Sequence, residues 1–387
     1  MNQENKIKIW KSRYVVMYVS IAFFVIYGLL SIIYLATNKN LFQGYGLFTN
    51  DQRFIYIVIV LLFSLFFALL VFFSCTNKKI KDYRLLMPSQ FKYLIFLIYS
   101  VMFLIACFDY MHRYNVLTLS LSISNINSSM SQLGYDVAHS DGKLSYTLIS
   151  LFPFLFLFFS YDREKKIKIV SFIYIIVTLL ILFISGRKEQ LLAGIIALVF
   201  RFKFTRDLRT LTIIGIPSLV LLVYFMNSVR GGLSSESIFY VLFQSQESYP
   251  LALGAYLIVN PLNIQLDTLF NSVMPYTVLI SMPTITGVIN QELFKTHEYG
   301  PVYSILGFMY YYFPISLFIV FIISKLMSLK INTLLSWGRE YTPIVVFYCV
   351  KFFILLRNGY LNFFLWDVFF SLVVFSLCFV FKYKESR

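Results

Sequence analysis

The segment ISGRKEQLL, residues 184–192, carries residue types well suited to holding an anion. Gly186, Arg187, Lys188 and Glu189 fall between two apolar runs, where one helix ends and the next begins. A helix N-terminus offers free backbone N–H groups and a partial positive charge. Because Arg and Lys side chains bind phosphate oxygens, the segment predicts a phosphate or pyrophosphate site at Arg187 and Lys188. The plainer interpretation is a tight hairpin whose cations reach toward lipid headgroups.

Two more arginines follow apolar runs at positions where the chain must turn. Arg230 stands in NSVRGGLSSES, where two glycines allow a ligand to approach the backbone closely. Arg357 stands in LLRNGYLN, between the last two apolar runs. Both are candidate pyrophosphate ligands. The alternatives are a solvated loop cation for Arg230 and a helix-end lipid anchor for Arg357.

His297 and Glu292 are the candidate catalytic residues, in the stretch NQELFKTHEYG. An imidazole has an unperturbed pKa near neutrality and can act as a general base, and a carboxylate can do the same. The alternative is that both are ordinary polar residues of a loop.

Several chemistries lack their motifs in this chain. There is no GK[ST] phosphate loop, no HExxH, no CxxC, no Asp-x-Asp pair and no GxSxG. The cysteines fall in or at the ends of apolar runs without close spacing, and we interpret them as small hydrophobic residues. The sequence therefore predicts neither a metal nor a cofactor.

The elements that must position these residues are transmembrane helices. Apolar residues make up 59% of the chain and charged residues 13%, with a mean hydropathy of +0.76. Soluble domains carry about 25% charged residues, so the bilayer must solvate most of this surface. We predict an all-α, multi-pass integral membrane protein, a single transmembrane domain over residues 1–387. Ten apolar runs are long enough to be candidate spans: 14–36, 54–74, 91–108, 145–161, 167–185, 189–204, 210–226, 302–324, 342–357 and 360–381.

The distribution of Lys and Arg gives the orientation. With the N-terminus inside, 23 of the 33 cations fall in cytoplasmic segments and nine in outer ones, and Lys351 lies within a span. This asymmetry predicts that both termini are cytoplasmic. It also explains most of the net charge of +15, so we predict no nucleic-acid partner. Lys351 and Asp367, eight residues either side of Gly359, are expected to form a buried ion pair.

Two outer segments are long, 109–144 and 227–301. Within the second, 238–259 and 264–286 are apolar but interrupted by prolines. We expect them to be interfacial or re-entrant helices on the outer membrane face. The loop would then cover an outward-facing cavity that Arg187, Lys188, Arg230 and Arg357 surround.

Three segments resemble a known family. SGRKEQLL, HEYGPVYSILGFMYYYFP and LLRNGYLNFFLWD are similar to segments of the bacterial O-antigen polymerases, the Wzy-like oligosaccharide repeat-unit polymerases. The resemblance covers most of the chain in topology and about forty residues in motif. It implies an inner-membrane enzyme of lipopolysaccharide biosynthesis whose active site faces the periplasm. Such an enzyme joins undecaprenyl-pyrophosphate-linked glycans without a metal and is associated with a chain-length regulator protein.

The resemblance also assigns site residues. Arg187 matches the family's basic residue at the start of a span, and Arg357 matches its late outer arginine. His297 looks similar to the histidine of the related O-antigen ligases, although Glu298 follows it where the ligases commonly have Asn.

Two other classes fit part of the pattern. A flippase of lipid-linked oligosaccharides would bind the same pyrophosphate, but it should carry cations deep in a central cavity and show two related halves. An O-antigen ligase or a membrane acyltransferase is the further alternative.

Overall fold

Helices make up almost all of the structure, a computed structural model that describes residues 15–37, 52–76, 78–88, 90–113, 143–184, 188–201, 250–278, 284–294 and 303–383. Within these ranges five helices are long and apolar enough to cross a membrane. They are Val15–Ala36, Arg53–Ser74, Gln90–His112, Lys165–Phe183 and Ile315–Trp337. The all-α membrane class is thus confirmed at this level. The count of ten spans, the orientation and the single domain stay predictions.

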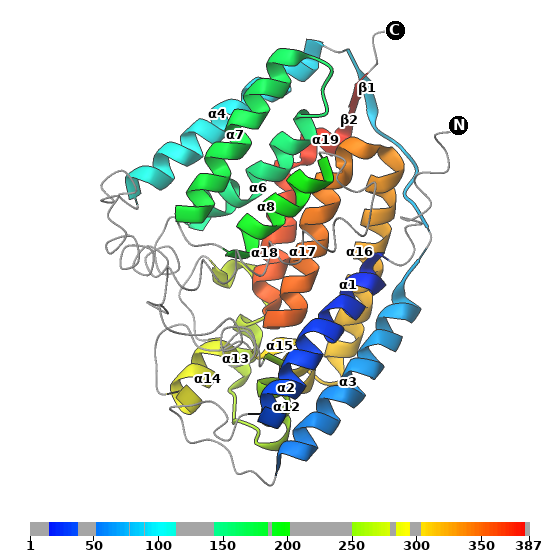
Figure 1. The fold of residues 1–387 in the computed structure, drawn as a ribbon, viewed down its shortest axis with the longest axis vertical. Helices are drawn as coiled ribbons and strands as arrows, with labels where there is room; N and C mark the ends of the chain where they lie inside the picture. The colour runs from blue at the N-terminus through cyan, green and yellow to red at the C-terminus, as the bar shows by residue number, and fades with distance from the viewer. Residues whose placement is uncertain are drawn as a thin grey trace. The chain divides into compact units, whose positions relative to one another are not determined.

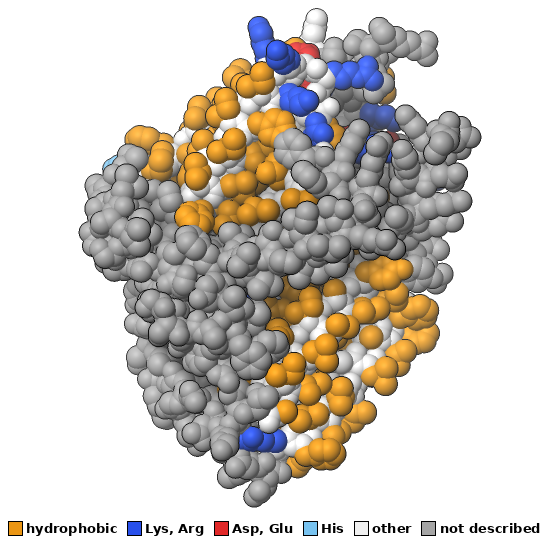
Figure 2. Space-filling view, in the orientation of Figure 1, with side chains coloured by type: hydrophobic (Ala, Val, Ile, Leu, Met, Phe, Trp, Pro, Cys, Tyr) orange, Lys and Arg blue, Asp and Glu red, His pale blue; other side chains and the backbone are white. Residues whose placement is uncertain are grey.

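The long helices expose apolar side chains in a manner that suits lipid and not water. On α3 (Arg53–Ser74), Leu62 is 64% exposed and Phe73 is 73% exposed. On α4 (Gln90–Arg113), Ile105 is 64% exposed and Phe108 is 70% exposed. Figure 2 shows hydrophobic side chains over much of the described surface around these helices. In water such faces would be unfavourable by about 25 cal/mol per Å² of apolar surface.

The chain divides into two compact units, each made of separate segments. The first comprises Met1–Ile80, Glu236–Ser336 and Tyr348–Trp366, and the second comprises Lys81–Ser235, Trp337–Phe347 and Asp367–Arg387. Three helices, α16 (Ile315–Trp337), α17 (Thr342–Asn358) and α18 (Leu361–Val374), contribute residues to both.

The first unit is built on two helical stretches that pack along each other (Figure 1). One runs through α1 (Val15–Phe23), the π-helix η4 (Phe24–Gly28) and α2 (Leu29–Thr37), and the other is α3. The end of α3 is fixed to α16, where the Asn332 amide nitrogen donates to the Thr76 carbonyl at 2.6 Å and the Ser328 hydroxyl donates to it at 3.1 Å. The unit's remaining elements are α12 (Pro250–Val259), α13 (Leu266–Asn271), η9 (Pro275–Val278), α14 (Ile285–Phe294) and α15 (Ser304–Tyr311).

The second unit is a helical cluster around α6 (Lys143–Phe159). This helix packs against α4, α7 (Lys165–Ile184) and α8 (Lys188–Arg201). Its core is aromatic: Phe103 lies 5.3 Å from Phe156 and 4.7 Å from Tyr174 between ring centroids. The unit also contains β1 (Leu85–Met87), η10 (Arg339–Tyr341), α19 (Ser376–Val380) and β2 (Phe381–Tyr383).

The two strands were not expected from the sequence. β1 pairs with β2 in parallel, with Leu85 opposite Phe381. Beside them Arg84 is held by a dense set of contacts: its Nε and Nη2 each donate to Asp82 at 2.8 Å, and its Nη1 donates to the Tyr341 hydroxyl at 2.5 Å. The guanidinium also lies 4.2 Å from the centre of the Trp337 ring. These hydrogen bonds hold the pKa of the Asp82 carboxyl below its usual range. Arg84 therefore fastens the segment before β1 to the end of α16.

The predicted span over 302–324 is wrong as a single helix. The structure has the eight-residue α15, a turn at Tyr312–Pro314, and then α16, which continues for 23 residues to Trp337. Pro314 has no N–H for an intrahelical bond, so it fits the start of a new helix and not the interior of a longer one. The 360–381 run is likewise divided, into α18 and α19.

α12 lies in a segment for which the sequence predicts an interfacial or re-entrant helix, 238–259. Every residue of α12 from Pro250 to Leu257 is buried. α12 packs against α15, α3 and α2 and is covered by protein over these residues. Whether it is interfacial or re-entrant stays a prediction. The predicted span over 210–226 lies outside the described residues, as do 114–142 and 202–249.

Candidate functional site

The structure describes the candidate site residues only in part. Arg187, Arg230 and His297 lie outside the described residues. Lys188 is the first residue of α8, but its side chain is not among those described. The convergence of the four cations on one cavity therefore stays a prediction. Of the four, Arg357 is the one whose side chain the structure describes.

Glu292 lies near the end of α14 on an exposed face. The opposite face of this helix buries Ile285, Ile289 and Leu293. This spacing of four residues is that of an amphipathic helix resting on the protein by one side. The Glu292 carboxylate is therefore open to the surroundings.

Arg357 lies in the last turn of α17 and is half-buried. A cation is favoured at this position because the helix C-terminus carries a partial negative charge. The guanidinium carbon lies 6.0 Å from the centre of the Tyr27 ring. That distance is at the outer limit of a cation–π contact, which is worth about 0.5–1 kcal/mol where it is exposed.

Tyr27 is one of several aromatic rings that lie together next to Arg357. It stacks on Phe23 at 5.2 Å and meets Phe353 edge to face at 5.7 Å. Phe353 lies one helical turn before Arg357, so the same group supports α17 and its terminal cation. Tyr27 sits in the π-helix η4, a local widening of the helix that occurs often at functional sites. Sequence reasoning missed Tyr27, since a tyrosine in an apolar run gives no sign of its partner.

The turn after Arg357 is shaped by Gly359. Its φ is +73°, in the left-handed region, and its N–H donates to the Leu355 carbonyl at 2.8 Å, which closes the end of α17. A Cβ at this position would lie 2.3 Å from the Ser304 carbonyl oxygen. The Tyr303 hydroxyl donates to the Gly359 carbonyl at 3.2 Å. The hairpin that carries Arg357 is thus fixed against the start of α15.

Gly359→Ala is expected to lower the melting temperature of the detergent-purified protein. A non-glycine residue in the left-handed region costs about 1–3 kcal/mol, and overlap with the Ser304 backbone adds to it because neither chain segment can move aside easily. Gly287→Ala is the matched control: Gly287 is exposed in α14, and its added Cβ would meet nothing closer than Thr284 Oγ1 at 3.8 Å. Equal melting temperatures for the two variants would contradict this account of the hairpin.

Asn358, next to Arg357, has an unsatisfied acceptor. Its side-chain oxygen is buried and has no hydrogen-bond partner in the part of the chain that the structure describes. Buried polar atoms of this kind are uncommon and call for an explanation. A hydroxyl or N–H group of a bound molecule would supply the missing donor.

Comparisons with protein-family models, with curated proteins and with solved structures found no match to this chain. Its function must therefore be inferred from its own residues.

The described residues contain no cluster of three or more His, Cys, Asp or Glu side chains that could hold a metal ion. The hairpin carries the half-buried Arg357 guanidinium and, next to it in sequence, the buried Asn358 amide oxygen, which accepts no hydrogen bond from a described residue. The guanidinium can pair with an anionic oxygen through two parallel hydrogen bonds. The amide oxygen can accept one from a hydroxyl. Together they suit a ligand that carries both a phosphate and hydroxyl groups.

Proposed function

We propose that this chain polymerises undecaprenyl-pyrophosphate-linked oligosaccharide repeat units into O-antigen or a related surface polysaccharide. It would act as a multi-pass glycosyltransferase of the bacterial inner membrane, with its active site on the periplasmic side. The observation that carries the proposal is the Arg357 hairpin in a chain rich in apolar helices: a half-buried guanidinium is followed by the buried Asn358 oxygen, which has no hydrogen-bond partner among the described residues. A pyrophosphate-linked glycan has an anion for the guanidinium and hydroxyl groups for the amide oxygen. Its lipid would hold it in the membrane.

The reaction needs no metal in this scheme. An acceptor-sugar hydroxyl forms a new bond to the anomeric carbon of the growing glycan, and the bond from that carbon to the pyrophosphate oxygen breaks. The hydroxyl proton passes to a general base, and undecaprenyl pyrophosphate leaves with its negative charge. Attack from the opposite face inverts the anomeric carbon. Fixed guanidinium groups in a water-poor site stabilise the departing charge, an effect that typically contributes about 10²–10³-fold per donor.

Each candidate residue has a role in this scheme. Arg187, Lys188, Arg230 and Arg357 would bind the pyrophosphate, with the arginines supplying paired donors. His297 or Glu292 would accept the proton. The partners would be the lipid-linked glycans, the surrounding membrane lipid and a chain-length regulator protein.

Deletion of the gene tests the function directly. In a lipopolysaccharide gel the deletion strain should show the lipid A core capped by a single repeat unit, and the wild-type gene should restore the ladder. Complete loss of O-antigen would instead indicate a flippase or a ligase. An unchanged ladder would exclude all three.

A further inference from the structure

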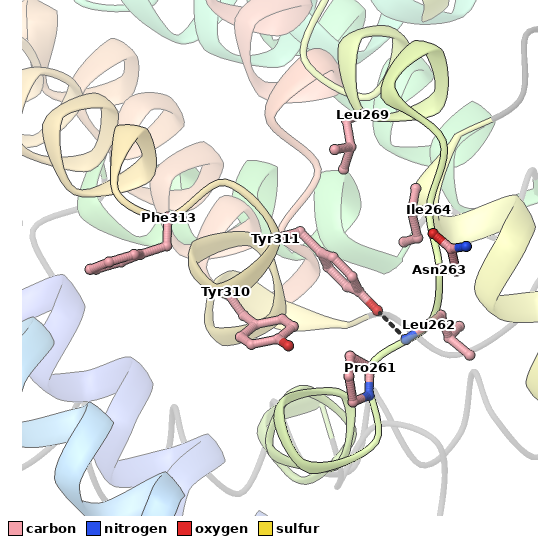
Figure 3. Close-up of a pocket in the computed structure, with 8 residues that line it drawn as sticks. All are labelled: Pro261, Leu262, Asn263, Ile264, Leu269, Tyr310, Tyr311 and Phe313. Atoms are coloured by element: carbon pink, nitrogen blue, oxygen red, sulfur yellow. Dashed lines mark hydrogen bonds between the residues drawn. The ribbon is translucent and has the colours of Figure 1, made fainter.

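An open pocket of about 500 Å³ lies in the first unit, at the N-terminal end of α16 (Figure 3). Its volume is within the range of small-molecule sites, about 300–1,000 Å³. The irregular stretch after α12 forms one side, the end of α15 and the turn that follows form the other, and α13 contributes Leu269. The lining residues are Pro261, Leu262, Asn263, Ile264, Leu269, Tyr310, Tyr311 and Phe313.

Two adjacent tyrosines form a corner in this pocket. The rings of Tyr310 and Tyr311 are 5.3 Å apart between centroids and inclined by 71°. Tyr310 is 36% exposed, so one of its faces remains open to a ligand. Phe313, 69% exposed, points away from this corner in Figure 3 and extends the aromatic surface.

Polar groups stand at the edge of the aromatic corner. The Leu262 N–H donates to the Tyr311 hydroxyl at 3.3 Å, which leaves the hydroxyl proton of Tyr311 available to a ligand (Figure 3). The Asn263 side chain is exposed and makes no hydrogen bond to any described residue. An amide group offers both a donor and an acceptor.

The pocket walls are held in place before any ligand binds. The Tyr312 hydroxyl donates to the Leu269 carbonyl at 2.5 Å, and the Ser316 hydroxyl donates to the Met309 carbonyl at 2.9 Å. Behind the wall, α15 packs closely on α12, where a Cβ at Gly254 would lie 2.9 Å from Ser304 Oγ. Because these contacts fix the tyrosines, binding would require little ordering of the protein.

We propose that this pocket binds a sugar ring of the lipid-linked glycan, which deepens the proposed function and rests on it. A pyranose has one face of C–H groups that stacks on an aromatic ring, and a rim of hydroxyl groups that matches Tyr311 and Asn263. A lipid acyl chain would cover the rings equally well but would leave the Tyr311 hydroxyl and the Asn263 amide without partners. Loss of such partners is unfavourable, so the mixed lining selects the sugar.

The role of the pocket is to hold the glycan, not to react with it. A ring bound between Tyr310 and the 261–264 stretch would fix the position of the neighbouring sugars relative to the reacting centre. Binding energy from a non-reacting part of a substrate is a general means of orienting the reacting part.

Photo-crosslinking in living cells tests the proposal. A benzophenone amino acid replaces Phe313, which keeps Tyr310 and Tyr311 intact, and the cell's own lipid-linked glycan is labelled with a radioactive sugar. We expect a labelled adduct of the protein, absent from cells that lack the enzyme adding the first sugar to the lipid. The matched control is the same probe at Phe318, which is 66% exposed on α16 but does not line the pocket. An absent adduct at 313, or equal adducts at 313 and 318, would overturn the proposal.

Two tyrosine variants test whether the adduct depends on the ring of Tyr310. With the probe at 313, Tyr310→Ala should reduce the adduct on the order of 10-fold, since the stacking surface is lost. Tyr276→Ala, which removes a 43% exposed tyrosine of the same unit outside the pocket, should leave it unchanged. The gene deletion separates the two proposals. If deletion leaves a single repeat unit but cells carrying the probe at 313 give no adduct, only the pocket proposal is overturned. If deletion removes all O-antigen but cells carrying the probe give an adduct at 313 and none at 318, the pocket is supported and polymerisation is overturned.

Discussion

Arg357→Lys is expected to lose most polymerisation while the protein stays in the membrane at wild-type level. The positive charge is kept, but Lys cannot reproduce the planar pair of donors that Arg presents to a pyrophosphate. If this guanidinium stabilises the departing pyrophosphate, the rate should fall on the order of 10²–10³-fold. The ladder of a complemented deletion strain, quantified at matched expression, measures the loss. Arg187→Lys should behave in the same way, since the sequence assigns it the same ligand.

A matched control is available within the chain. Arg339 is exposed in η10, outside the proposed site, and Arg339→Lys should leave the ladder unchanged. Arg357→Ala removes the charge as well as the geometry and should be no better than Arg357→Lys. Wild-type ladder length in Arg357→Ala would remove Arg357 from the pyrophosphate site. If Arg357→Lys gives a normal ladder and Arg357→Ala gives none, the positive charge of residue 357 is sufficient and the geometry of the guanidinium is not required.

The long helices were predictable because length and absence of charge define a span. The run at 54–74 became α3, Arg53–Ser74, and the run at 167–185 became α7, Lys165–Ile184. In both, the apolar signal comes from the residues of the helix itself and depends on no distant partner. The predicted bounds were therefore correct to within about two residues, the usual spread at helix ends.

The error at 302–324 has a different cause. The predicted span ended before Lys325 and Lys330, but both lysines lie within α16. Long cationic side chains can bury their methylene groups along a helix while the charge reaches a polar region, so a cation does not mark the end of a helix. In addition, α16 buries the polar residues Ser324, Ser328 and Asn332, which local hydropathy does not favour. Ser328 and Asn332 find their hydrogen-bond partner at the end of α3, about 250 residues away.

Of the candidate site, the structure bears on the position of Arg357. The sequence predicts it at the turn between the last two apolar runs, and it lies in the last turn of α17, just before that connection. The sequence did not predict the contact with Tyr27, or the Asn358 oxygen that has no partner among the described residues, because both depend on how α17 packs against other segments. The pairing of β1 with β2 was missed for the same reason, since three-residue strands have no periodicity that a sequence pattern can register.

His297→Ala is expected to lower the polymerisation rate on the order of 10²–10⁴-fold, the contribution typical of a general base. Glu292→Gln should change it only a few-fold, because Glu292 lies on the open face of α14, whereas a base works best next to the substrate where water is excluded. The measurement is the initial rate of chain growth with purified protein and lipid-linked repeat units. The reverse order of effects would assign the base to Glu292.

The dependence of the rate on pH distinguishes the two bases independently of any substitution. A general base acts in its deprotonated form, so the rate falls as the pH drops through the pKa of the base. An imidazole ordinarily loses its proton near neutrality, so it would cause that fall between roughly pH 7 and pH 6, whereas a carboxylate would keep the rate high at more acidic pH. We expect the higher transition in the wild-type protein and its disappearance in His297→Ala, whose residual rate should be nearly flat over this range. A wild-type rate that stays constant from pH 7 to pH 5 would exclude an unperturbed His297 as the base.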